Sequence, residues 1–485
     1  MCDVAILWLS LGALFGGQAT ATDEDPSRQS YEHFRGRYEL YSTIGDFSAG
    51  ELRTLTRMNV AGSEFNDDDV PHLAGLVSML TLDLTGTQIT DEGLKRLGAL
   101  DLPLRTLILA DTKITDAGIG HLSTMLWLEA LDLSGTAATG KGVARILSFE
   151  GRITSLKLAS GTTDSDLEVV PALENLHTLR FPTDKVTPAG MQHVVRSKSL
   201  RDLGLHGDRL SPKTFAKVAS LTQLERLDIS GFAKLNDRAL QLIRPLQELH
   251  FLDVSNTAVT DKGLVHVLAL PKLTHLVLSG TGVTDKGLKL LGEMVWGDGD
   301  DFTLSTATVI THLELASTAI TDRGLKNLKA LHLLHLDISR TFVTNRCQRS
   351  LTGWKLHSLN IEGEFGLTDL SFIENLPELE RLDVSHRPRI MSEISHLGGH
   401  PSLAVLDISY TDLMDSAMMK LVRCDALRQI NVAGTAVTLP SLIALARSGK
   451  LELVNVRDTN INTAGSQRRE ILPGVTVSRG ETFPN

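Results

Sequence analysis

The sequence predicts an α/β solenoid, a coil of short repeats stacked along a single curved axis. Two observations lead to this fold class. The segment LDVSNTAVTDKGL at residues 252–264 returns 24 residues later as LVLSGTGVTDKGL at residues 276–288, and a fixed period of that length is typical of repeat architectures. Each repeat also joins a short alternating apolar segment to a segment with helical periodicity.

The repeat around Leu252 shows how one unit is built. Leu252 and Val254 alternate with polar residues, which predicts a short, half-buried strand. Thr260 or Asp261 can cap a helix in which Leu264, Val267 and Leu268 form one apolar stripe. Because stacked strands lie about 4.8 Å apart and packed helices about 8–10 Å apart, the coil is expected to curve with its strands inside.

The central apolar residue of each predicted strand recurs every 23–25 residues, with one longer step of 37 residues between Leu276 and Leu313. This spacing predicts about seventeen coils. The central positions are Met58, Leu82, Leu107, Leu131, Leu156, Leu179, Leu203, Leu227, Leu252, Leu276, Leu313, Leu336, Leu359, Leu382, Leu406, Ile430 and Val454.

The N-terminal segment has the pattern of a targeting signal. Residues 4–15 form one apolar run, which is too short to span a bilayer, and Ala19-Thr20-Ala21 follows as a small-residue cleavage motif. This pattern predicts a signal peptide over residues 1–21, cleaved near Ala21, and export of the mature chain to the periplasm, the cell surface or the medium. The alternative is an apolar N-terminal arm, because no basic residue precedes the run.

The other segments are assigned from their relation to the repeats. Residues 22–50 are expected to cap the first coil, because an end coil otherwise exposes apolar surface and a strand edge. The solenoid is predicted over residues 51–456, with an inserted surface loop at 295–306; the aspartates of this loop leave calcium binding open, although the glutamate of a calcium loop is missing. Residues 457–485 are expected to close the far end, with Val475 and Val477 in a last half-strand.

Composition excludes several classes of protein. The net charge is −10 and no Lys/Arg cluster is present, which argues against a basic nucleic-acid interface. No apolar run after the first is long enough to cross a membrane. Cys347 and Cys424 lie about three coils apart, roughly 14 Å along the stack, so they are predicted to be reduced core residues.

The phrase LxxLxLxxTx[IV]TDxGLxxL resembles leucine-rich repeats, with close matches at Leu82–Leu97, Leu107–Leu122, Leu252–Leu268, Leu276–Leu291 and Leu313–Leu328. Its helix start is similar to the cysteine-containing, ribonuclease-inhibitor-like subclass and to repeats of exported bacterial proteins. The resemblance implies a horseshoe with a concave parallel sheet and short convex helices, acting as a protein-recognition scaffold.

The chain departs from the usual pattern of that subclass at the turn after each strand. Thr stands where Asn or Cys is usual, and its hydroxyl is expected to bond backbone in the neighbouring coil. These threonines are Thr87, Thr112, Thr136, Thr257, Thr281, Thr318, Thr341, Thr411, Thr435 and Thr459.

The residue after each central position is expected to face the concave surface, because side chains alternate along a strand. We call these residues the acidic column, because eight of the sixteen are acidic and two are basic. The column suits a basic partner attracted by charge, although Asp also belongs to the repeat consensus and is tolerated in water. It comprises Asp83, Ile108, Asp132, Lys157, Arg180, Gly204, Asp228, Asp253, Val277, Glu314, Asp337, Asn360, Asp383, Asp407, Asn431 and Asn455.

The residue before the central position is His in three successive predicted coils, and we call His275, His312 and His335 the histidine column. Imidazoles on neighbouring strands can bind a metal such as Zn²⁺ or form a patch whose charge changes between pH 5 and 8. They can equally be ordinary exposed histidines. Phe251 precedes them as an expected exposed aromatic anchor, which centres the predicted contact area on coils nine to twelve.

The sequence thus favours a monomeric, non-enzymatic scaffold that binds a protein or peptide, with no cofactor. We find no GxSxG, HExxH, Walker or dinucleotide-binding motif. The alternatives are a structural role in the cell envelope and metal-dependent binding at the histidine column. The predicted partner-binding residues are Asp228, Phe251, Asp253, His275, His312, Glu314, His335, Asp337, Asp383 and Asp407.

Overall fold

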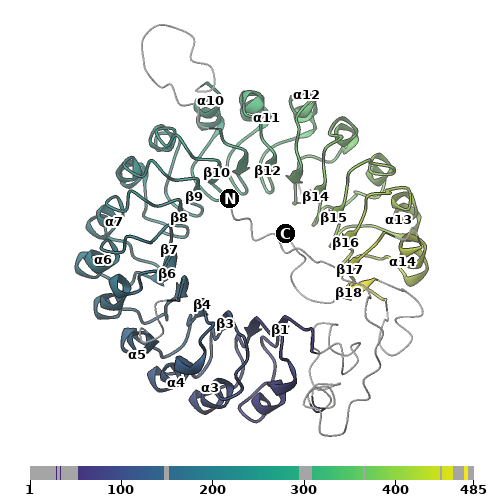
Figure 1. Ribbon diagram of the computed structural model, residues 1–485. Coiled ribbons are helices and arrows are strands. Elements are labelled where there is room, and N and C mark those ends of the chain that lie inside the picture. Colours follow the sequence, from purple (N-terminus) through teal and green to yellow (C-terminus); the bar gives the residue numbers. More distant parts are fainter. Residues whose placement is uncertain are drawn as a thin grey trace.

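The chain winds into an open solenoid in the computed structural model, with strands on the inside of the ring and helices on the outside (Figure 1). The structure describes residues 29, 33, 53–146, 152–293, 309–363, 366–447, 450–461 and 475–478. The predicted signal segment, most of residues 22–50 and the predicted insert at 295–306 lie outside these residues.

The described strands form one parallel sheet of eighteen strands. They are β1 (Arg57–Asn59), β2 (Thr81–Asp83), β3 (Thr106–Ile108), β4 (Ala130–Asp132), β5 (Ser155–Lys157), β6 (Thr178–Pro182), β7 (Asp202–His206), β8 (Arg226–Asp228), β9 (Phe251–Asp253), β10 (His275–Val277), β11 (His312–Glu314), β12 (His335–Asp337), β13 (Ser358–Asn360), β14 (Arg381–Asp383), β15 (Val405–Asp407), β16 (Gln429–Asn431), β17 (Leu453–Asn455) and β18 (Thr476–Ser478).

Short helices return the chain along the convex side. The α-helices are α3 (Asp91–Gly98), α4 (Asp116–His121), α5 (Gly140–Ile146), α6 (Pro188–Val194), α7 (Pro212–Val218), α8 (Asp237–Leu240), α9 (Leu264–Val267), α10 (Asp285–Glu293), α11 (Asp322–Asn327), α12 (Gln348–Leu351), α13 (Asp415–Leu421) and α14 (Leu439–Ala446). The 3₁₀ helices are η1 (Val70–Gly75), η2 (Leu122–Thr124), η3 (Asp164–Ala172), η4 (Gln241–Ile243), η5 (Leu328–Ala330), η6 (Asn345–Cys347), η7 (Ser371–Asn375) and η8 (Glu393–His396).

The strand register confirms the predicted central positions. Each strand pairs with the next along the chain, so that Leu252 pairs with Leu227 on one side and with Leu276 on the other. All seventeen predicted central residues are buried in one continuous core. The last strand, β18, contains Val477 and pairs it with Val454, as expected for a final half-strand.

The turn threonines do not bond the neighbouring coil, so that prediction was wrong. In all ten, the hydroxyl donates to the carbonyl oxygen three residues earlier in the same coil, at 2.5–2.7 Å. The preceding residue adopts a positive φ, as at Gly86, Asn256 and Tyr410, and this tight turn brings the hydroxyl close to its own strand. The threonine therefore stabilises the turn within a coil.

The contact between coils is made instead by an aspartate near the start of the helix. This aspartate follows threonine at six positions, but it follows asparagine at Asp67 and Asp237 and methionine at Asp415. Its carboxylate accepts the backbone N–H of the next coil's threonine at 2.6–2.8 Å and the hydroxyl of the same threonine at 2.5–2.7 Å. We call these residues the aspartate ladder. Its members in the described chain are Asp67, Asp91, Asp116, Asp164, Asp237, Asp261, Asp285, Asp322 and Asp415.

The ladder also explains the glycine of the TDxGL motif. A Cβ atom on Gly118 would lie 2.2 Å from Asp91 Oδ1 and 3.1 Å from Asp91 Cα. A similar overlap is met at Gly142 and Gly324, where the Cβ atom would lie 2.5 Å and 2.4 Å from a ladder carboxylate. The helix start therefore needs glycine because the previous coil's aspartate occupies the space of a side chain.

The structure also bears on the predicted state of the two cysteines and on the segment expected to cap the first coil. Cys347 and Cys424 are free and buried, as predicted, and burial raises the pKa of the Cys347 thiol to about 12. His33, from the segment expected to cap the first coil, contacts Asp69 at 2.7 Å and stacks on His72 at 3.6 Å between ring centroids.

The ladder glycine can be tested by substitution. Gly118→Ala is expected to lower the free energy of unfolding by about 1–3 kcal/mol, because the new methyl group displaces the Asp91 carboxylate. Chemical denaturation of the full chain measures this change. Gly161→Ala is the matched control, because no atom lies within 4 Å of the added Cβ; equal stability of the two variants would contradict the proposed crowding.

Candidate functional site

The concave surface is formed by the residues on either side of each central position. In β9, Leu252 is fully buried while Phe251 and Asp253 are partly exposed, and β12 shows the same pattern around Leu336. Because the strands line the inside of the ring, these flanking side chains face the hollow (Figure 1). The acidic and histidine columns therefore run as neighbouring rows across the strands.

Most aspartates of the acidic column also have a structural role. Their Oδ1 atoms accept the backbone N–H two residues later, as Asp253 does from Ser255 at 2.8 Å and Asp337 from Ser339 at 2.8 Å. The same bond is made by Asp83, Asp132, Asp228, Asp383 and Asp407. In each of these aspartates, Oδ1 is thus used by the turn that every repeat contains, whereas Oδ2 can make other contacts.

Cations neutralise the column over its N-terminal half. Arg180 on β6 donates to Asp202 on the next strand, β7, at 3.2 Å and to Asp228 on β8 at 3.2 Å. It passes across Gly204, where a Cβ atom would lie 2.2 Å from its Nη1 atom. Lys157 pairs with Asp132 at 2.9 Å. Asp228, one of the predicted partner-binding residues, is therefore already engaged in an ion pair.

From β9 onward the column remains acidic. Within the described residues, no ion pair reaches Asp253, Glu314, Asp337 or Asp383. Glu314 is an exposed residue at the end of β11. Partial burial of its carboxyl group, together with Asp337 and Asp253, raises its pKa to about 7. Burial and the neighbouring Asp407 raise the pKa of Asp383 to about 6.

Burial also raises the pKa values of Asp253 and Asp337 above their usual range. Like charges on adjacent strands repel one another, since the strands lie only about 4.8 Å apart. The carboxylates of β9–β15 thus form a site where negative charge accumulates. Among the described residues, Arg180, Arg340 and Arg387 act on it electrostatically without forming an ion pair with Asp253, Asp337 or Asp383.

The histidine column forms a continuous stack. The ring centroids of His275 and His312 are 3.7 Å apart with an interplanar angle of 18°, and those of His312 and His335 are 3.9 Å apart at 14°. The hydroxyls of Thr274 and Thr311 lie 2.8 Å and 2.9 Å from the Nδ1 atoms of His275 and His312. The register of the parallel sheet places the three rings face to face.

Stacking affects the metal hypothesis for this column. Imidazole lone pairs lie in the plane of the ring, so parallel stacked rings direct their nitrogen atoms side by side rather than toward one point. A metal site needs convergent donors. The arrangement is that of an aromatic platform, and metal binding by His275, His312 and His335 remains an untested hypothesis.

Phe251 extends the platform at one end and is less exposed than predicted. Its ring lies 6.3 Å from that of His275. The guanidinium of Arg226, in the same column on the previous strand, lies 3.8 Å from the Phe251 ring centroid. This cation–π contact covers part of the ring, so Phe251 is half-buried.

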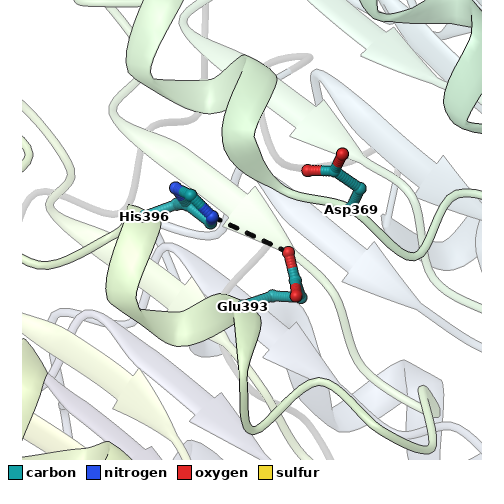
Figure 2. Close-up of side chains that lie close together, drawn as sticks. All are labelled: Asp369, Glu393 and His396. Carbon is teal, nitrogen blue, oxygen red and sulfur yellow. Dashed lines mark ion pairs between the residues drawn. The ribbon is translucent and has the colours of Figure 1, made fainter.

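One group of potential metal ligands was not found from the sequence. Asp369, Glu393 and His396 offer donor atoms that all lie within 4.8 Å of one another, and Figure 2 shows their side chains around a common space. Glu393 and His396 stand three residues apart on η8, a spacing that places them on one face of a helical turn. The spacing of Glu393 and His396 could have indicated a pair of metal ligands in the sequence. Asp369 could not be recognised in this way, because it lies in the preceding coil and follows Thr368 as in other TD pairs.

Sequence comparison agrees with this geometry. A family model for the leucine-rich repeat matches residues 76–98, 269–292 and 306–329. The molecule is a leucine-rich-repeat solenoid. No curated protein matches this sequence.

Solved structures with a similar course include other proteins of this repeat type. The chain is similar to an internalin, InlF, from Listeria monocytogenes, with 17% identity and a TM-score of 0.30 over 95% of this chain and 96% of that one. It is similar to TLR13 in a complex with ssRNA13, with 16% identity and a TM-score of 0.47 over 91% and 72%. It is also similar to the yeast Rad7 and Elc1 complex, with 14% identity and a TM-score of 0.43 over 93% and 92%.

The helices of this leucine-rich-repeat solenoid were also considered as membrane spans. Within the described residues, none combines the length and the apolar character that crossing a bilayer requires.

The raised pKa of Glu314 predicts a dependence of stability on pH. Between pH 4.5 and about pH 7, the Glu314 carboxyl group is protonated to a greater extent in the folded protein than in the unfolded chain. Stability contributed at this residue therefore falls as the pH rises through that window. Glu314→Gln is expected to melt about 1–2 °C above the parent near pH 8 and at nearly the same temperature near pH 4, below both pKa values.

Thermal melting at both pH values measures this difference. Glu174→Gln, at an exposed position between η3 and β6, controls for the loss of one negative charge. A shift of the same size in both variants would contradict a local effect of the concave surface.

Proposed function

We propose that this leucine-rich-repeat solenoid is a non-enzymatic scaffold that binds a basic protein or peptide segment on its concave face. The observation that supports this most directly is the pairing of two rows on the same strands. Carboxylates at Asp253, Glu314 and Asp337 run beside the stacked rings of His275, His312 and His335. The predicted contact area over β9–β12 coincides with this pairing.

The two rows can recognise different parts of one basic side chain. A guanidinium stacks on aromatic faces and also donates hydrogen bonds to carboxylates in a planar fork. The chain itself provides an example, because Arg226 stacks on Phe251 and lies 3.6 Å from Asp202. An arginine-rich partner lying across the strands would repeat this contact over several coils.

Charge would also guide the approach of the partner. A concave surface lined by one sign of charge attracts oppositely charged molecules, and salt screens the attraction. Asp383 and Asp407 on β14 and β15 extend the negative row beyond the histidine stack. Neutralisation by a basic partner would relieve the repulsion that, after burial, contributes to the raised carboxylate pKa values.

A charge-neutralised variant tests the proposal. The substitutions Asp253→Asn, Glu314→Gln and Asp337→Asn keep the Oδ1 acceptors that Ser255 and Ser339 require and remove three charges. Binding of a fluorescein-labelled oligo-arginine peptide, followed by anisotropy, is expected to weaken by about tenfold. The parent's affinity should fall as salt is added.

The control removes the same number and type of charges elsewhere. Asp101→Asn, Glu174→Gln and Asp425→Asn change exposed carboxylates in turns between a helix and the following strand. Equal weakening in both triple variants would show attraction to net charge only. If the parent does not bind the peptide, the result would favour the alternative of a structural role in the cell envelope.

We also propose that the scaffold acts outside the cytoplasm as a monomer. Support comes from the apolar run at residues 4–15, followed by Ala19-Thr20-Ala21. Intact-mass measurement of the protein recovered from its native host should show loss of residues 1–21. Recovery of the uncleaved chain from the cytoplasmic fraction would contradict export.

A further inference from the structure

We propose that Asp369, Glu393 and His396 bind one divalent transition-metal ion of the Zn²⁺ type at the joint between the coils of β13 and β14. The three donors come from both coils. Asp369 precedes η7, whereas Glu393 and His396 belong to η8 of the following coil. Their ligand atoms lie within 4.8 Å of one another, close enough for one ion to contact all three.

The imidazole is oriented for this role by a fourth side chain. His396 Nδ1 lies 2.6 Å from Glu374 Oε1 on η7. When that nitrogen carries the proton, Nε2 presents its lone pair on the opposite side, where Glu393 Oε2 lies 3.8 Å away (Figure 2). Metal-binding histidines in proteins are commonly held by such a carboxylate on their second nitrogen.

Asp369 differs from the aspartate ladder in having lost its usual partner. It follows Thr368 in a TD pair, but the next coil carries Ile390-Met391 where other coils place the capping threonine. The N–H groups of Ile390 and Met391 bond to Asp412 of the coil after that. Asp369 accepts the N–H of Ser371 at 2.9 Å within its own coil.

The site is accessible and carries the charge that a dication would balance. The three donors line an open surface pocket of about 570 Å³, together with Arg389, Thr368 and Ser371. Asp369, Glu374 and Glu393 bring three negative charges, and Arg389 brings one positive charge, which leaves a net of two negative charges with a neutral His396.

The donor set favours one class of ion. An imidazole together with carboxylates suits Zn²⁺ and its neighbours, whereas Ca²⁺ prefers oxygen ligands alone. Bound there, the ion would connect two coils between which the aspartate ladder is interrupted. It would therefore stand in for the missing ladder contact, beside the bonds of His396 to Glu374 and of Leu370 to Glu393, and stabilise the fold by mass action.

Calorimetric titration of the chelator-treated full chain with ZnCl₂ tests the site. The parent should bind one ion at Asp369, Glu393 and His396, with a rise in melting temperature. Both effects should disappear in His396→Ala and in Glu393→Gln, which keeps an oxygen acceptor for the N–H of Leu370. CaCl₂ should produce neither effect. Melting of each variant without metal checks that it folds.

Two controls locate the ion. His332→Ala removes an exposed histidine from the turn before β12 and should leave zinc binding unchanged. His312→Ala removes the middle ring of the histidine column and should also leave it unchanged. The proposal is overturned if the parent binds no zinc, if His396→Ala binds it as the parent does, or if binding is lost in His312→Ala instead.

Discussion

The carboxylates of the aspartate ladder make the contact that most often joins one coil of this solenoid to the next. Most ladder aspartates stand at the first residue of a helix, where the partial positive charge of the helix N-terminus stabilises a negative side chain. From there each one accepts two hydrogen bonds from the next coil. The ladder aspartate thus stabilises the start of its own helix and also positions the start of the helix in the next coil. The glycine of TDxGL leaves the space that the aspartate side chain needs.

The stacking has a consequence for the concave face. Because every coil places the same two positions over the hollow about 4.8 Å from their neighbours, any residue repeated there forms a row. Repeated histidines become a stack of rings, and repeated carboxylates become a line of mutually repelling charges. Where Arg180 and Lys157 interrupt that line, the charges are paired within the protein. Over β9–β15 no ion pair between described residues reaches the acidic column, and burial together with neighbouring carboxylates raises the pKa values of Glu314 and Asp383.

The repeat also departs from its usual pattern between β13 and β15. Here the helices shorten to the 3₁₀ turns η7 and η8, and Arg387 is buried in the turn where other coils have threonine, donating to the carbonyl oxygen of Ile361. The ladder contact is also missing at this joint. Residues that do not make the contacts of the repeat can form others, and Asp369, Glu393 and His396 lie close together at this joint.

The sequence by itself determined what each coil repeats: the central leucines, the burial of Cys347 and Cys424, and the membership of both concave columns. These features follow from period and alternation, which are properties of the chain. Only the tertiary structure decided how side chains meet across coils. It turned the threonine hydroxyls back to their own strands, led Arg180 across Gly204 to Asp228, covered Phe251 with Arg226 and brought Asp369 to His396. The physical reason is that a period fixes the direction of a side chain, whereas its partner depends on the residues that happen to stand one or two coils away.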